Sequence, residues 1–193
     1  VYGPFVLPND MAFYGEPGPK DSHDKNAALM IVHACQAAHD AGVDFSQYDT
    51  DGDGVLDNVF VYYAGHNQAE GASENTVWPH QGSISVYDVV LDGVRCASYA
   101  CASEFRGTKG NTICGAGTFC HEFGHVLTLP DFYDTTYKYY SVANWDVMCS
   151  GNYNNNGRTP PLYSAYERFY LGWLTPTQLE EPGTYALSSG GSK

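Results

Sequence analysis

The segment His121-Glu122-Phe123-Gly124-His125 constrains this chain more than any other part of its 193 residues. Four residues make slightly more than one helical turn, so a helix here projects both imidazole rings from one face. Two such nitrogens can bind the same Zn²⁺ ion, with Glu122 beside the metal and free of it. Apolar neighbours predict that this helix, over about 116–128, is buried and faces a cleft.

A zinc site that catalyses a reaction needs a third protein ligand and an open fourth position. Asp131 follows Pro130, just beyond the predicted end of the helix, and its carboxylate can turn back toward the metal. Asp134 and Glu167 are the alternative third ligands. Two histidines and one carboxylate leave the fourth position open, which favours a catalytic site over a purely structural one.

A second group of potential metal ligands alternates with other residues in a loop. Its members are Asp49, Asp51, Asp53 and Asp57, with the carbonyl of Val55. The spacing resembles the start of an EF-hand loop, but Phe60 stands where the final glutamate belongs and a strand follows. Clustered carboxylates repel one another without a cation. We therefore expect a structural Ca²⁺ site here, with a solvated acidic turn as the alternative.

The composition excludes several classes of protein. A net charge of −13 repels phosphates, so nucleic acid is not an expected partner. The longest apolar runs, such as Val59–Ala64, are too short to cross a bilayer, and no basic amphipathic stretch predicts membrane insertion. The length predicts a single domain over 1–193 that builds its core without disulfides.

Helical and strand patterns are mixed along the chain. A helix is expected from Asp21 or Ser22 to about Ala41, ended by Gly42. The run Val59–Ala64 predicts a buried strand. The remaining expectations are a hairpin turn at Asp92-Gly93, a third helix over about 162–171, irregular segments over 1–20 and 131–159, and a linker over 188–193.

Six cysteines permit three disulfides, and Cys96 with Cys101 is the nearest local pair. Buried free thiols are the alternative. An even cysteine count and an acidic surface favour an oxidising compartment. The chain begins at Val1 without a visible signal peptide, so we expect a processed or excised piece.

Several motifs together resemble the immune inhibitor A-like family of secreted bacterial metallopeptidases. The segments that carry this resemblance are 48–57, 117–125, 129–134, 145–148 and 165–173. The order of a zinc helix and a later turn containing Met148 is also similar to the metzincin pattern.

The resemblance implies an α+β metzincin-like fold with a mixed twisted sheet. An upper lobe over about 1–127 would hold the calcium loop and the zinc helix. A lower lobe over about 128–193 would hold the third ligand, the Met-turn and the C-terminal helix. It further implies zinc at the cleft floor, bound by His121, His125 and Asp131, with Glu122 as general base and Met148 beneath the metal.

Two residues depart from the metzincin pattern. Thr128 stands where those proteins commonly have a glycine, and a β-branched residue resists the positive φ of a sharp turn. Ser150 stands where some of them have a tyrosine that stabilises the transition state. Tyr153 is a nearby candidate for that role. Of the other histidines, His66 or His80 could approach the cleft.

The expected function is that of a zinc endopeptidase acting on proteins or peptides, which would lie extended along an edge strand. The resemblance implies a secreted or cell-surface protein made as a zymogen, with an N-terminal propeptide and further domains, and we expect a monomer. The alternative is a non-catalytic, calcium-stabilised binding module on a degenerate scaffold. The intact Glu122 argues against it, because a binding site has no use for a base.

Overall fold

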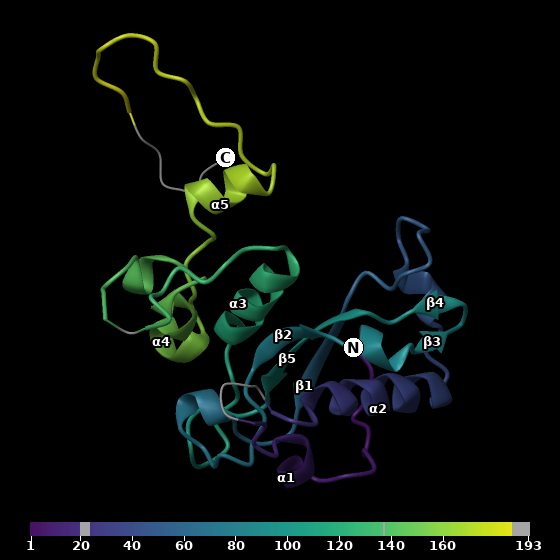
Figure 1. The fold of residues 1–193 in the computed structure, drawn as a ribbon. Helices are drawn as coiled ribbons and strands as arrows, with labels where there is room; N and C mark the ends of the chain where they lie inside the picture. The colour runs from purple at the N-terminus through teal and green to yellow at the C-terminus, as the bar shows by residue number, and fades with distance from the viewer. Residues whose placement is uncertain (20–23, 137, 187–193) are drawn as a thin grey trace.

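The computed structural model describes residues 1–19, 24–136 and 138–186, which form the expected α+β fold (Figure 1). The helices are α1 (Met11–Tyr14), α2 (Ala27–Asp40), α3 (Ala116–Val126), α4 (Asn154–Gly157) and α5 (Ala165–Tyr170). The strands are β1 (Val59–Tyr63), β2 (His80–Ser83), β3 (Val90–Leu91), β4 (Val94–Arg95) and β5 (Ser98–Ser103). Among the short 3₁₀ helices are η1 (Phe45–Tyr48), η2 (Gln68–Glu70), η3 (Ser85–Tyr87), η4 (Ala143–Trp145) and η5 (Ser150–Tyr153).

A small mixed sheet organises the first two thirds of the chain. Its order is β1-β5-β2, with β1 parallel and β2 antiparallel to the central β5. This arrangement makes β2 an edge strand. β3 and β4 form a separate hairpin. Its turn at Asp92-Gly93 has φ values of 51° and 88°, which confirms the predicted tight turn.

The two longest helices cover opposite faces of this sheet, and the alternation of side chains along β1 shows why (Figure 1). On one face, Val59, Val61 and Tyr63 join the main apolar cluster with buried residues of α2. On the other face, Phe60 packs against Phe119 of α3, with ring centroids 4.6 Å apart. The sheet therefore supports α3 from behind.

α3 begins at Ala116 as predicted, but the other two predicted helices begin later than expected. α2 begins at Ala27, with Asn26 at its N-cap, and the expected caps Asp21 and Ser22 lie outside the described residues. Gly42 follows its end with a φ of 89°. α5 begins at Ala165 rather than near 162, because Ser164 and Glu167 form a capping box there. The segment 131–159, expected to be irregular, contains η4, η5 and α4.

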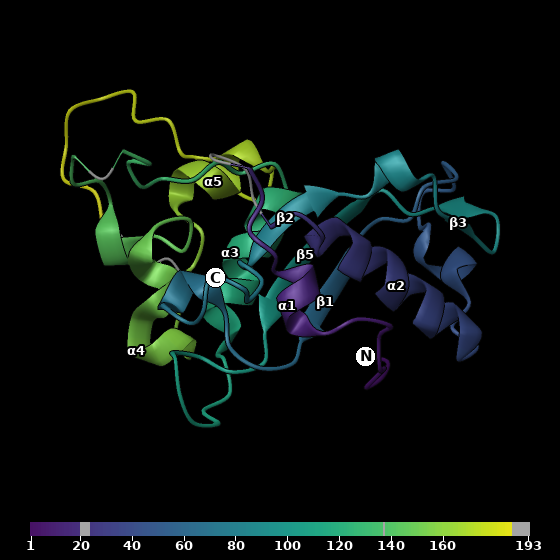
Figure 2. The ribbon, with the colours of Figure 1, turned by 60° about the horizontal axis from the view of Figure 1, so that its bottom comes forward.

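Beyond α3, the chain builds a second, smaller apolar cluster. Its buried members are Leu129, Val147 and Met148, with Phe132 and Tyr163 packed against them. The segment that contains α4 lies against α3, on the side away from α2 (Figure 2). The division of the chain into an upper and a lower lobe stays a prediction.

Glycines let the backbone of the segment 150–158 approach α3 closely. A Cβ on Gly117 would lie 1.7 Å from the carbonyl oxygen of Asn152, and one on Gly115 would lie 2.1 Å from that of Gly157. Gly124 makes the same allowance for the sulfur of Met148, at 2.3 Å from the position of a Cβ. At these three positions, α3 therefore meets its neighbours through its backbone.

The cysteines do not pair as expected. All six are free thiols, and Cys96 hydrogen-bonds to Cys35 of α2 rather than approaching Cys101. The Cys101 sulfur lies 3.6 Å from Nδ1 of His80. Cys96 and Cys101 flank the start of β5, which holds them apart along an extended strand. Within the described ranges, every helix is too short or too polar to span a bilayer.

We predict that Gly117→Ala destabilises the protein although alanine favours a helix by about 1 kcal/mol. The new methyl group meets backbone, which cannot rotate away, so urea denaturation should show a net loss of about 3 kcal/mol. Gly183→Ala is the control, because a Cβ there meets nothing closer than 3.4 Å and the expected change is within about 0.5 kcal/mol. Equal stability of the two variants would contradict the packing described for α3.

Candidate metal centre and cleft

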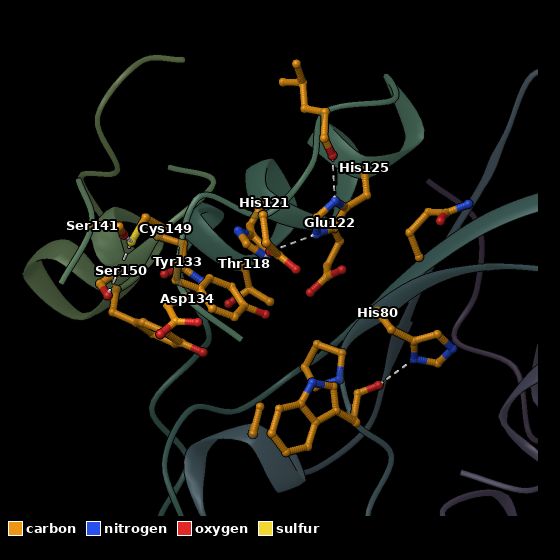
Figure 3. A pocket seen from close by; sticks show the side chains of 18 of the residues that line it. His80, Thr118, His121, Glu122, His125, Tyr133, Asp134, Ser141, Cys149 and Ser150 are labelled. Carbon is orange, nitrogen blue, oxygen red and sulfur yellow. Dashed lines mark hydrogen bonds and ion pairs between the residues drawn. The ribbon is translucent and has the colours of Figure 1, made fainter. Parts of the chain in front are cut away.

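Three potential ligand atoms converge beside α3. His121 and His125 project from one face of the helix (Figure 3), and Asp131 returns from the segment that follows. The Asp131 Oδ1 atom lies 3.2 Å from Nε2 of each histidine. These atoms lie within 4.8 Å of one another, close enough to hold one metal ion. The structure therefore brings together the three residues singled out in the sequence.

Main-chain carbonyls determine which ring nitrogens face the centre. Nδ1 of His121 lies 2.9 Å from the carbonyl oxygen of Val147, and Nδ1 of His125 lies 2.8 Å from that of Leu129. A carbonyl can only accept, so each Nδ1 donates, and each neutral ring directs the lone pair of Nε2 toward Asp131. Asp131 Oδ1 is buried without a hydrogen bond. Converging lone pairs around this buried oxygen fit a bound cation.

The turn after α3 carries Asp131 to the histidines. Leu129 N donates to the Gly124 carbonyl, and Thr128 N donates to that of His125, each at 3.0 Å. These two bonds form a Schellman motif with Thr128 in the left-handed position, at a φ of 73°. The turn expected of a glycine is therefore made by a threonine, at a cost of roughly 1–2 kcal/mol in backbone strain.

A second turn, over residues 146–149, connects the histidines to the Asp131 segment. The Asp146 side chain accepts a hydrogen bond from Met148 N at 2.8 Å. The Met148 carbonyl accepts one from Phe132 N at 2.8 Å, next to Asp131. The Met148 side chain is fully buried against Gly124 of α3. The turn thus positions one histidine through Val147 and the carboxylate through Phe132.

The three groups carry complementary charge. Burial lowers the pKa values of His121 and His125, but Asp131, the Glu122 charge and the main-chain carbonyls together outweigh burial and raise both. Burial raises the pKa of Asp131, but the two imidazoles outweigh it and hold that pKa well below its usual range. The centre therefore requires positive charge beside Asp131, supplied by protons or by a cation.

Glu122 lies on the same helix and is only 6% exposed. Burial raises the pKa of its carboxyl to about 7, although His121 and His125 act in the opposite direction. A carboxylate with a pKa near the working pH is suited to accept and return a proton. In Figure 3 the Glu122 side chain lies beside the two histidines.

The alternative third ligands have other roles. Asp134 accepts hydrogen bonds from the backbone of Thr136, Lys138 and Tyr139, and so shapes the loop that follows it. Glu167 is fully buried and caps α5 through Ser164. Neither belongs to the group of potential ligands around Asp131.

The centre opens into a cleft of about 770 Å³. His80 lines it, but its ring bonds to the Trp78 carbonyl and the Tyr99 hydroxyl and points away from α3 (Figure 3). His66 is not among the lining residues. Tyr153 does line the cleft, as does Tyr133, which stacks on His121 with ring centroids 6.4 Å apart.

Tyr133 and Glu70 are among the lining residues that the sequence analysis did not single out. Tyr133 lies two positions after Asp131. Once Asp131 is taken as a metal ligand, its closeness in the sequence predicts that Tyr133 also lies near the metal centre. Glu70 comes from η2 and reaches the cleft from the other side. An isolated glutamate in a loop carries no sequence signal of this kind.

The aspartate loop is only partly assembled as expected. Carboxylate oxygens of Asp49, Asp51 and Asp57 lie within 4.8 Å of one another. Asp53 is not in this group, because its carboxylate accepts a hydrogen bond from Val55 N at 2.8 Å. Gly54 makes the tight turn with a φ of 81°. Calcium binding at this loop stays a prediction.

Comparison with known proteins agrees with this geometry. The chain is 27% identical over 202 residues to the pre-pro-metalloprotease PrtV of Vibrio cholerae serotype O1, covering 87% of this chain and 22% of that protein. It is 28% identical over 197 residues to immune inhibitor A of Bacillus thuringiensis subsp. alesti, covering 86% and 28%. The chain thus spans about a quarter of the length of these curated relatives.

The family described as immune inhibitor A peptidase M6, catalytic domain, matches residues 2–173. This match contains the α3 motif, the Asp131 turn and the 146–149 turn. The chain therefore belongs to the immune inhibitor A family of peptidases.

Proposed function

We propose that this domain is a zinc-dependent endopeptidase in which Glu122 is the general base. The observation that carries the proposal is the convergence of His121, His125 and Asp131 beside the buried Glu122 carboxyl. Three donors of this kind suit Zn²⁺ and leave a fourth position open. Family membership supports a metal and proteolysis.

Each residue has a distinct part in peptide hydrolysis. Zinc held by the three side chains would act as a Lewis acid toward the scissile carbonyl and would lower the pKa of water. Glu122 removes a proton from the attacking water and passes it to the leaving amine. Its pKa of about 7 suits both transfers, because the carboxylate is a competent base and its conjugate acid a competent donor.

The substrate peptide would lie along β2. This edge strand borders the cleft through His80 and Gln81, and no strand of the described residues pairs with its outer side. An extended peptide can add to such an edge by main-chain hydrogen bonds. That alignment would carry a scissile bond past Glu122.

The alternative is a non-catalytic binding module. Burial of Glu122 argues against it, because an uncompensated buried carboxyl destabilises a fold and is retained where it has chemistry to perform. The comparisons, with a peptidase family and a metalloprotease, also do not favour it.

The proposal also covers the processing, secretion and oligomeric state of the full-length protein. The Vibrio relative is named as a pre-pro-metalloprotease. We propose that this protein is likewise a monomeric bacterial enzyme, secreted as a zymogen with a propeptide and further domains. N-terminal sequencing and light scattering of the natural secreted product test this, and an unprocessed intracellular product would contradict it.

Glu122→Gln should lower kcat for casein cleavage by roughly 10²–10⁴-fold, since the amide cannot take the proton. Zinc content, measured by atomic absorption, should stay near one ion per chain in both proteins. Proteolysis retained in the variant would overturn the role of Glu122. Zinc in both proteins with cleavage in neither would favour the binding module.

Asp131→Asn should weaken zinc binding by more than about 100-fold, because it replaces a charged ligand at the centre. Asp134→Asn is the matched control, since Asp134 accepts hydrogen bonds from its own loop and lies outside the group of potential ligands around Asp131. Its zinc affinity, measured by competition with a chromophoric chelator, should change by no more than a few-fold. If Asp134→Asn lowers the zinc affinity more than Asp131→Asn does, Asp131 is not the third ligand.

We also propose that Asp49, Asp51 and Asp57 hold a structural Ca²⁺ ion, supported by their convergence. Calcium at about 100 times its Kd should then raise Tm by roughly 5–10 °C. Asp51→Asn should remove the shift, and Mg²⁺ should produce a smaller one. An equal Tm with calcium and with chelator would reject the site.

A further inference from the structure

Glu70 is an acidic residue that lines the cleft and has no part in the proposed chemistry. Its Oε2 atom accepts a hydrogen bond from Gly107 N. Its own backbone N donates to Asn67 at 2.9 Å, and buried Asn67 is anchored by Ser103 at 2.7 Å. These bonds position the carboxylate, with its Oε2 atom held by Gly107 N.

An aromatic ring accompanies this carboxylate. Tyr153 lines the same cleft and is 45% exposed, so its ring is available to a ligand. Burial raises the pKa of its hydroxyl, and the charges of Glu70 and Glu122 raise it further. The ring, the positioned carboxylate of Glu70 and the Glu122 carboxyl therefore line one cleft.

The charged residues that line the cleft indicate whether its ligand is positively or negatively charged. None of the described residues that line the cleft is a lysine or an arginine. Three of the four acidic lining residues are already engaged: Glu122 and Asp131 at the metal centre, and Asp134 with its loop. The fourth is Glu70, which forms no ion pair with any of the described residues.

We propose that Glu70 and Tyr153 form a subsite for a lysine or arginine side chain of the substrate. The inference rests on the proposed peptidase function and specifies its substrate class. The Glu70 carboxylate would accept a charge-assisted hydrogen bond from the cation. The Tyr153 ring would provide an apolar wall and a face suited to a cation.

Fluorescent peptides test this subsite by binding, independently of turnover. The peptides are made in pairs that differ at one position, with arginine in one peptide and citrulline in the other. Citrulline has nearly the same shape as arginine without the charge. The position is moved stepwise along the residues around one scissile bond. The binding protein carries Glu122→Gln, so the peptides stay intact. We expect about tenfold tighter binding of the arginine peptide at one position, the equivalent of one charge-assisted hydrogen bond.

The same measurements are made on two further variants of the Glu122→Gln protein, one with Glu70→Gln added and one with Glu74→Gln added. Glu74 is exposed and outside the cleft, so its replacement changes the net charge equally without touching the subsite. We expect the arginine preference to disappear with Glu70→Gln and to remain with Glu74→Gln. Tyr153→Leu should reduce it about threefold. Melting curves establish that each variant is folded.

The outcomes separate the subsite from the peptidase. If the unmodified domain cleaves no peptide while the arginine preference depends on Glu70, the proposed function fails and the subsite stands. If cleavage occurs without a preference, or the preference survives Glu70→Gln, the subsite is rejected. Absence of any preference in the Glu122→Gln protein alone rejects it as well, whether or not the Glu70 variant folds.

Discussion

Two hydrogen bonds from imidazole Nδ1 atoms to main-chain carbonyls determine the geometry of the whole centre. They direct the Nε2 lone pairs of His121 and His125 toward Asp131. Both acceptors are backbone atoms from turns after α3, so the ligand atoms are aligned only when these turns have folded. The centre is therefore a product of the fold, and α3 alone cannot form it.

Close backbone packing holds those turns in one conformation. Gly115 and Gly117 admit the main chain of the segment 150–158 against α3, and Gly124 admits the sulfur of Met148. Main-chain contacts do not depend on side-chain rotamers, so they hold the turn at 146–149 with little freedom. The strained backbone of Thr128 is tolerated in these surroundings, because neighbouring contacts determine its conformation.

Local spacing predicted much of this centre. Two histidines four residues apart must share a helix face, and a carboxylate just beyond the helix end is within reach. The hairpin at Asp92-Gly93 follows from turn chemistry in the same way. Features that depend on distant contacts could not be predicted. Gly107 holds the Glu70 carboxylate at the cleft, and Cys96 meets Cys35 of α2.

The hydrogen bond between Phe132 N and the Met148 carbonyl closes a loop at its base. The segment between them supplies much of one cleft wall, including Tyr133, Tyr139 and Tyr140. Surface loops tolerate changes of length when their ends are fixed. Insertions or replacements within 135–144 could therefore reshape what the cleft accepts while the metal centre stays intact. In this architecture, new selectivity could evolve separately from the chemistry.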